Sequence, residues 1–113
     1  MTGARVAADG SAGVPVVTDN PHRSRFELHV GGELAGFVDY RLRGHVLNLV
    51  HTEVLPKYQG EGLAADLARA SLDAARERHL AVIPSCPYIR SWLGSHPEYA
   101  DLVPEDRRAG FGL

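Results

Sequence analysis

The sequence predicts an α/β protein of the α+β type, with a mixed, mostly antiparallel sheet and the element order β-β-β-α-β-α. Residues 25–55 alternate polar and apolar side chains in runs separated by glycines. Residues 60–78 repeat small apolar residues at helical spacing, and residues 80–83 are apolar throughout. The first pattern is typical of half-buried strands, the second of an amphipathic helix, and the third of a buried strand. A strand, a helix and another strand in this order predict a crossover between parallel strands.

Size and composition predict one globular domain. The chain has 113 residues, of which 44% are hydrophobic and 23% are charged, values that suit a single soluble domain. No apolar run approaches the roughly 20 residues that span a bilayer, and the N-terminus lacks the basic-then-apolar form of a secretion signal. We therefore expect a cytoplasmic protein with no membrane partner.

The net charge and the pattern of cysteine and histidine residues argue against a nucleic-acid-binding protein and against a metal-binding protein. The formal net charge is −2, which does not favour a nucleic-acid partner. Cys86 is the single cysteine, so an internal disulfide and a multi-cysteine metal site are excluded. The six histidines form neither an i, i+4 pair nor a His-Glu-x-x-His motif, so we expect no metal.

The two ends of the chain are expected to lie outside the domain. Residues 1–22 are rich in Ala, Gly, Val and Ser without a sustained period, and Asn20-Pro21 reads as a stop, which predicts a flexible N-terminal tail. The domain itself is expected over residues 23–104. Residues 105–113 are polar and contain glycine, and they are predicted to be a C-terminal tail.

The first half of the domain reads as an antiparallel meander. Strands are predicted at residues 25–30, 33–43 and 45–55, with turns at Gly31-Gly32 and Gly44. In the third strand, period two places His51 and Glu53 on one side, together with Leu47 and Leu49.

A glycine-spaced corner follows the third strand. Leu55 and Pro56 begin a tight connection, Gln59-Gly60-Glu61-Gly62 follows it, and a helix is expected from about Gly60 to Arg78. The first N–H groups of a helix are unpaired and lie at the positive end of its dipole, so this corner is a predicted phosphate receptor. Glycine permits both positive φ angles and close backbone approach. The dinucleotide-binding pattern would need a glycine where Ala65 stands, and no Gly-Lys-Ser/Thr follows, so neither that pattern nor a P-loop is present.

The second half begins with a predicted buried strand at residues 80–84. Pro84 and Pro87 then bracket Ser85-Cys86, and residues 88–95 read as a short helix that Pro97 ends. Residues 98–103 are expected to return toward the sheet.

The corner resembles the signature of a known superfamily. Gln59-Gly60-Glu61-Gly62-Leu63-Ala64 is similar to the Arg/Gln-x-x-Gly-x-Gly/Ala motif of the GNAT superfamily of acyl-CoA N-acyltransferases. The similarity extends to the strand that ends Glu53-Val54-Leu55-Pro56, to the Pro84-Ser85-Cys86-Pro87 segment with Tyr88, and to His96-Pro97-Glu98-Tyr99. Together these motifs resemble a minimal GNAT-like subgroup, and the match covers roughly residues 25–103.

The resemblance implies a fold and a reaction. The implied fold is GNAT-like but lacks the helical pair that usually separates the first two strands, with Gly31-Gly32 in its place, which implies an open, shallow acceptor groove. The implied reaction is transfer of an acyl group, most simply acetyl from acetyl-CoA, to a primary amine of a protein lysine or a small molecule. The pantetheine arm would lie along Val54, Leu55 and Pro56. The implied phosphate contacts are Gln59, Gly60, Glu61, Gly62, Leu63 and Ala64, with Arg90 as a candidate for the 3′-phosphate.

Amide formation from a thioester needs an unprotonated amine, a polarised carbonyl and a proton for the departing thiolate. His51 and Glu53 are the candidate bases, and the imidazole suits neutral pH better, although either side chain could simply be a cross-strand or solvent partner. Many members of the superfamily use a tyrosine as the acid, but the equivalent position falls near Trp92, which has no usable proton. Cys86 could donate the proton or take the acyl group itself, and Tyr88 is a weaker substitute. A small buried residue is the structural alternative for Cys86.

Two other functions remain open from the sequence. One is a non-catalytic module that binds or senses acyl-CoA, and the other is thioester chemistry through an acyl group on Cys86. The oligomeric state is expected to be a monomer or a homodimer, because a small sheet with an exposed edge can pair with a second copy.

Overall fold

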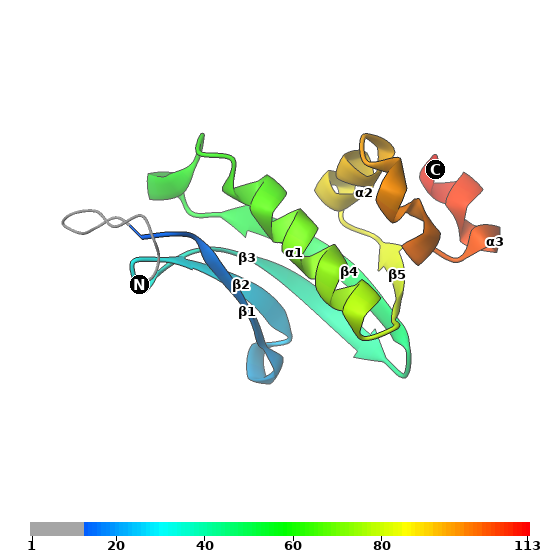
Figure 1. Cartoon of the computed structure of the whole chain (residues 1–113), viewed down its shortest axis with the longest axis horizontal. Coiled ribbons are helices and arrows are strands. Elements are labelled where there is room, and N and C mark those ends of the chain that lie inside the picture. Colours follow the sequence, from blue (N-terminus) through cyan, green and yellow to red (C-terminus); the bar gives the residue numbers. More distant parts are fainter. Residues whose placement is uncertain (1–12) are drawn as a thin grey trace.

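The computed structural model describes residues 13–113, which form one mixed sheet with helices on one face (Figure 1). The five strands lie side by side in the order of the sequence. They are β1 (Val16–Asn20), β2 (Arg25–Val30), β3 (Glu33–Arg43), β4 (Val46–Val54) and β5 (Ala81–Pro84). The helices are α1 (Leu63–Glu77), α2 (Pro87–Gly94) and α3 (Glu105–Arg108), with 3-10 turns at Pro21–Arg23, Pro56–Tyr58, Pro97–Leu102 and Ala109–Phe111.

The sheet is antiparallel from β1 to β4 and parallel between β4 and β5. Helix α1 connects the two parallel strands and crosses the sheet, with contacts to every strand. Helix α2 lies beside α1 on the same face, over β4 and β5. The predicted α+β architecture with a mostly antiparallel sheet is confirmed.

The strand β1 was missed by the sequence prediction. Residues 1–22 were expected to be a tail, but Val16–Asn20 pairs with β2 along its length, and a 3-10 turn at Pro21–Arg23 joins the two strands. Asp19 of β1 accepts a hydrogen bond from the hydroxyl of Tyr40 at 2.6 Å, which also ties this strand to β3. Residues 1–12, the rest of the expected tail, lie outside the described residues.

With the added strand and the additional helix α3, the order of strands and α-helices is β-β-β-β-α-β-α-α. The first two strands are therefore β1 and β2, and the short connection between them is the turn at Pro21–Arg23. The Gly31-Gly32 hairpin was expected between the first two strands, but it joins the second and third strands.

A bulge in β4 reverses the side on which its residues point. Asp39 of β3 pairs with His51 and the next residue of β3 pairs with Leu49, so Val50 has no partner on β3. Leu47 and Leu49 are fully buried under the helices. After the bulge, His51 lies on the opposite face, where its ring is 6.3 Å from that of Phe37. The prediction that His51 shares a side with Leu47 and Leu49 was wrong, because a bulge adds one residue to the period of two.

The main core lies between the sheet and α1. Its largest fully buried members come from both layers and include Leu28, Leu49, Val38, Leu67 and Leu72. Gly36 of β3 lies directly beneath the helix. A Cβ atom there would be 2.7 Å from the backbone oxygen of Glu53 and 3.1 Å from Leu67 Cδ1, so only glycine fits this close approach without displacement.

The C-terminal third packs against the same core. Residues 98–103 form most of a 3-10 turn and not the expected extended return, and Val103 is fully buried. Residues 105–113 were expected to be a tail, but they form α3 and a further 3-10 turn, and Phe111 and Leu113 pack against the core. The prediction of a tail was wrong because it considered the polar composition of residues 105–113 as a whole and not the two apolar side chains that make these contacts.

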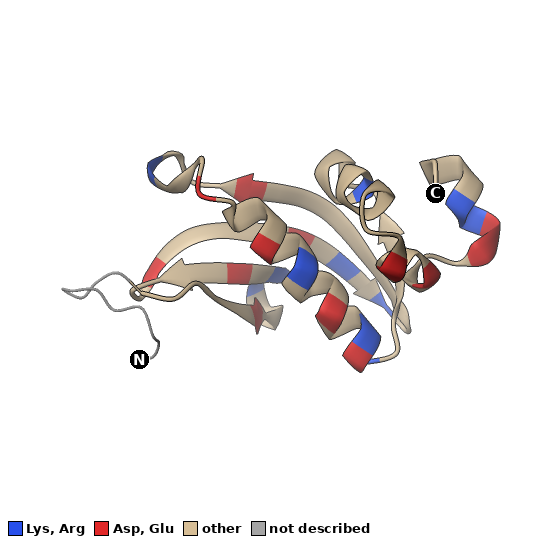
Figure 2. Ribbon diagram, turned by 45° about the horizontal axis from the view of Figure 1, so that its top comes forward, with Lys and Arg blue, Asp and Glu red and all other residues tan. Residues whose placement is uncertain are grey.

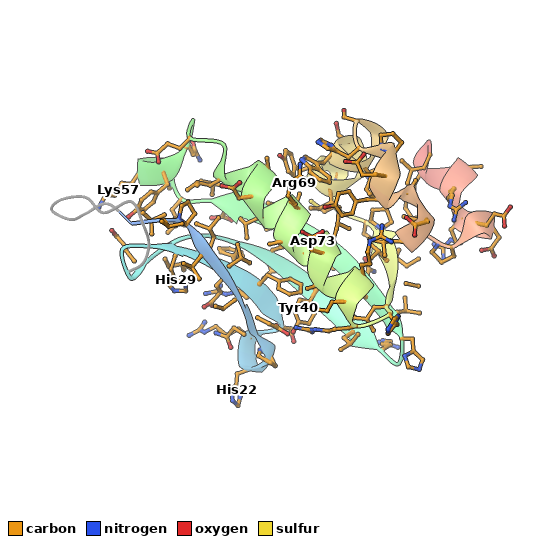
Figure 3. The ribbon with its side chains drawn as sticks, in the orientation of Figure 1. His22, His29, Tyr40, Lys57, Arg69 and Asp73 are labelled. Carbon is orange, nitrogen blue, oxygen red and sulfur yellow. The ribbon has the colours of Figure 1, made fainter. Side chains whose placement is uncertain are left out.

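Polar contacts join α1 to this C-terminal part. Figure 3 shows Arg69 and Asp73 on α1. The hydroxyl of Tyr99 donates to Asp73 Oδ1 at 2.7 Å and accepts from Arg69 at 3.4 Å. The Arg69 guanidinium also lies 5.2 Å from the centre of the Trp92 ring. Trp92 is therefore a packing residue of the α1–α2 interface.

Candidate functional site

The glycine-spaced corner leaves the N-terminus of α1 open. Gly60 and Gly62 have φ angles of +86° and +78°, and Gly62 caps the helix without a side-chain hydrogen bond. Within the described chain, the N–H of Gln59 donates to the oxygen of Pro56, and the next N–H with a backbone partner is that of Asp66 in α1, which donates to the oxygen of Gly62 at 3.4 Å. A Cβ atom at either glycine would meet no atom within 4 Å. The corner thus presents unpaired N–H groups to open space at the positive end of the helix dipole, which is the arrangement that binds anionic groups.

A hollow of about 250 Å³ opens beside this corner, between the end of β4, α1 and α2. It is lined by Val54, Tyr58, Gln59, Gly60, Gly62, Leu63, Ala64, Ala65 and Tyr88. Six of the predicted cofactor residues line it, while Leu55, Pro56 and Glu61 flank it in the chain. Its walls combine backbone donors at one end with apolar and aromatic side chains at the other.

The corner is fastened to β4 by its glutamine. Gln59 Nε2 donates to the backbone oxygen of Val54 at 3.0 Å, and the N–H of Gln59 donates to the oxygen of Pro56 at 3.3 Å. Because the side chain closes this loop, the glutamine of the motif positions the backbone of the corner.

Beyond its midpoint, β4 has a free edge toward β5. The two strands pair only from Val46 with Ala81 to Leu49 with Pro84, and the N–H of Cys86 makes the last bond across, to the oxygen of Leu49 at 2.8 Å. The strand β4 continues to Val54 while the other chain turns away into α2. This unpaired edge can accept an extended, amide-bearing group in the manner of an added strand.

Cys86 lies at the point where the two strands separate. Its side chain is 3% exposed, and its Sγ atom is 3.4 Å from Thr52 Oγ1. Sequence reasoning gave no role to Thr52, because the bulge that turns it toward Cys86 has no signal in the residue pattern. Among residues 13–113, the hydroxyl of Thr52 is the polar side-chain group within hydrogen-bond distance of this thiol.

His51 and Glu53 are brought together as predicted. His51 Nε2 is 3.2 Å from Glu53 Oε1, and about half of each side chain is exposed. Both lie on the sheet face opposite α1, whereas Cys86 belongs to the core on the helix face. The structure therefore separates the His51–Glu53 pair from Cys86 by the thickness of the sheet.

Tyr88 is better placed than the sequence suggested. It is 38% exposed and lines the hollow from the first turn of α2. Burial, with a smaller contribution from the charges of Asp66 and Cys86, raises the pKa of Tyr88 above its usual value of 10.0. The phenol thus holds its proton at neutral pH.

Arg90 does not line the hollow. Its Nη2 atom lies 3.5 Å from the backbone oxygen of Ser85, and its guanidinium carbon is 5.9 Å from the centre of the Phe111 ring. The structure therefore gives this arginine a packing contact near the C-terminal end of the chain.

The described residues contain neither a cluster suited to a metal ion nor a helix suited to a membrane. Between residues 13 and 113 there is no group of three or more His, Cys, Asp or Glu side chains placed to hold a metal ion. In the same part of the chain, no helix has the length and apolar character needed to cross a membrane.

Comparisons with known proteins identify relatives over most of the chain. The family described as GCN5-related N-acetyl-transferase matches residues 25–102. Protein NATD1 from Homo sapiens is 31% identical over 88 residues, which cover 75% of this chain and 78% of that protein. Protein NATD1 from Gallus gallus is 30% identical over 88 residues, with coverage of 75% and 80%.

A solved structure supports the fold. A protein from Staphylococcus aureus, described as a GCN5-like N-acetyltransferase, matches with a TM-score of 0.61 and 23% sequence identity. The match covers 79% of this chain and 87% of that one. At this level of identity, the likeness concerns the arrangement of strands and helices alone.

Proposed function

Because this chain belongs to the GCN5-related N-acetyltransferase family, we propose that it transfers the acetyl group of acetyl-CoA to a primary amine, either a protein lysine or a small amine. One observation carries the proposal. The open N-terminus of α1 lies over a hollow that adjoins the free edge of β4. A diphosphate fits the open N-terminus, an amide-bearing arm fits the hollow and the free edge of β4, and the thioester at the end of the arm would reach the point where β4 and β5 separate.

The cofactor would be held mainly by backbone groups. Its diphosphate would accept hydrogen bonds from the N–H groups at Gly60 to Ala64, and its arm would follow the edge of β4 near Val54. The thioester would then lie near Thr52 and Cys86, where β4 and β5 separate. The cofactor supplies the activated acyl group, so the protein acts largely by positioning it.

The amine would approach from the opposite face of the sheet, where His51 and Glu53 are exposed. His51 would take a proton from the ammonium group, directly or through water, with Glu53 orienting the ring by the 3.2 Å contact. The amine nitrogen then forms a bond to the carbonyl carbon, the bond from that carbon to sulfur breaks, and the nitrogen releases its second proton to water.

The departing thiolate needs a proton, and two groups near the hollow can supply it. Tyr88 lines the hollow and holds its proton at neutral pH. Cys86 lies closer to the separation of the strands, but its side chain is almost fully enclosed. We assign the donor role to Tyr88 and keep Cys86 as the second candidate.

The decisive experiment measures thiol release from acetyl-CoA with a panel of small amines and lysine peptides. We expect turnover by the parent protein and a loss of about 10²–10⁴ in kcat for His51→Ala, the range typical of a general base. His22→Ala is the matched control, because His22 lies in the exposed turn between β1 and β2 and should leave the rate unchanged. Absence of thiol release with every acceptor would contradict the proposal.

Further measurements separate the alternatives. Tyr88→Phe should lower kcat more than Cys86→Ala if the phenol is the donor. Binding of acetyl-CoA in a calorimeter without any turnover would indicate a sensing module. A mass increase of one acetyl group that disappears in Cys86→Ala would indicate an acyl group on the thiol.

A further inference from the structure

A second hollow lies on the sheet face opposite α1, at the end of the molecule away from the glycine corner. Its volume is about 340 Å³, and it is lined by Arg41, Arg43, Val46, Asn48, Ile83 and Arg107. These residues come from β3, β4, β5 and α3, so the hollow exists only in the folded chain. Figure 2 shows blue segments near the β3–β4 turn and on α3 at the same end of the molecule.

Positive charge gathers at this hollow against the overall balance of the chain. Arg41 and Arg43 lie two residues apart on β3, so their side chains are on the same face of the sheet. Arg41 pairs in register with Asn48 of β4, and Arg43 pairs with Val46. Arg107 reaches the same hollow from the other side of β5, from α3. In the described part of the chain, none of these three guanidinium groups takes part in an ion pair. A protein of net charge −2 thus presents three uncompensated positive charges at one place.

The floor of the hollow holds an unsatisfied acceptor. Asn48 Oδ1 is buried and has no hydrogen-bond partner within residues 13–113. A buried polar atom without a partner costs about 1–3 kcal/mol, so such atoms are rare in folded proteins. Val46 and Ile83 provide apolar surface beside it.

These features define the chemistry of an occupant. Guanidinium groups form paired hydrogen bonds with carboxylates. The apolar neighbours suit a short hydrocarbon chain. We propose that this hollow binds the carboxylate end of the acceptor, so that the substrate carries both an amine and a carboxylate.

The position of the hollow relative to His51 supports this assignment, which rests on the proposed acetyl transfer. Asn48 lies three residues before His51 on β4, or about 10 Å along the strand. A third hollow of about 440 Å³, lined in part by Asp39, Arg41 and Val50, lies between them and shares Arg41 with the first. The two hollows therefore meet at Arg41, and His51 lies on the same face of the sheet.

The test compares acceptors that differ in one charge. 6-Aminohexanoate and 8-aminooctanoate are long enough to place a carboxylate in the hollow and the amine near His51, about 10 Å away along the strand, and their primary amides are the neutral partners. We expect kcat/KM to be at least about tenfold higher for each acid than for its amide, since hydrogen bonds to charged groups are worth about 1.5–3 kcal/mol. Equal values for acids and amides would overturn the proposal.

Variants locate the effect. Arg41→Gln, Arg43→Gln and Arg107→Gln should each raise KM for the acids about tenfold while kcat and KM for the amides stay the same. Arg78→Gln is the control, because it removes the same charge at the far end of α1, where Arg78 pairs with Asp19. If Arg78→Gln has the same effect, the preference reflects overall charge and the hollow is not the site.

Binding without turnover separates this inference from the proposed function. Amide chemical shifts of the parent protein, followed during titration with 8-aminooctanoate, should move at Arg41, Asn48 and Ile83, and the same shifts in Arg43→Gln should need about tenfold more ligand. Binding at these residues with no acetyl transfer to any amine would support the carboxylate site and contradict the proposed acetyl transfer. Acetyl transfer with no shift at these residues would support the proposed reaction and contradict the carboxylate site.

Discussion

At the scale of single residues, the site depends on backbone conformations that few residue types adopt. Gly62 has a φ angle of +78° at the cap of α1, where a side chain would be strained although space is available for it. The sequence indicated this corner correctly, because glycine spacing and the residues after it describe local geometry. It did not indicate Thr52 or Asn48, since their environment is created by strands that are distant in the chain.

Replacing Gly62 tests the corner directly. Gly62→Ala forces a left-handed conformation on alanine, which costs roughly 1–2 kcal/mol, so the corner should distort and acetyl-CoA should bind more weakly. Calorimetric titration measures the affinity. Gly94→Ala, at the end of α2 where a Cβ atom meets nothing within 4 Å, is the control and should bind normally. Unchanged affinity for acetyl-CoA in Gly62→Ala would mean that phosphate binding does not depend on the conformation of this helix cap.

The carboxylate of Glu27, on the sheet face opposite α1, leads to a prediction of how the stability of the protein changes in acid. The hydrogen bond from Arg25, at 2.7 Å, and that from Asn20, at 3.1 Å, hold the pKa of Glu27 below its usual value of 4.5. A carboxyl with a lowered pKa in the folded state stabilises the protein above the unfolded pKa, and this stability is lost as pH falls through the folded value. Glu27→Gln should therefore lower the free energy of unfolding by about 1 kcal/mol at pH 7.

The difference between Glu27→Gln and the parent should be constant from pH 7 to about pH 5 and should shrink below the usual pKa of 4.5. Urea unfolding at a series of pH values measures it. A difference that persists unchanged at pH 3 would mean that the charge of Glu27 does not stabilise the fold.

At the scale of elements, the contact between α1 and the sheet fixes where the corner lies. The helix begins at the corner, and one turn later Leu67 rests on Gly36 of β3. The order of the last four strands and the two larger helices could be predicted, because each has a clear hydrophobic pattern. The strand β1 could not, since its side chains are largely half-buried or exposed and it is stabilised by pairing with β2.

Gly36→Ala should disturb this contact. The added Cβ atom would lie 2.7 Å from the oxygen of Glu53, so backbone must shift, at a cost of about 1–3 kcal/mol. Thermal unfolding should show a lower Tm, and acetyl-CoA affinity should fall with it because α1 moves. Gly110→Ala, which meets no atom within 4 Å, should keep the parent Tm. Equal Tm values for both variants would indicate that the helix is free to adjust.

At the scale of the whole molecule, one core joins the sheet, α1 and the C-terminal third. Tyr99, Leu102 and Val103 belong to the same buried cluster as Leu28 and its neighbours in the sheet. The sequence predicted one domain but placed both chain ends outside it, because short polar segments with few apolar residues resemble tails until their partners are known. The distinction between an edge strand and a tail is thus set by tertiary contacts.

Unfolding should therefore be a single transition. Trp92 reports on the interface between α1 and α2, while far-ultraviolet circular dichroism reports on the whole backbone. Both signals should give the same midpoint in urea, since small single domains usually unfold in one step. An earlier midpoint for Trp92 fluorescence would show that the C-terminal third unfolds separately.

The extra residue in β4 has a kinetic consequence. It places Thr52 and Val54 on the side of the proposed donor hollow and His51 and Glu53 on the opposite side of the sheet, so the proposed donor and acceptor would not compete for space. If both occupy the protein at once, initial-rate plots against one substrate at fixed levels of the other should intersect. Parallel lines would mean that the acetyl group leaves CoA before the amine arrives.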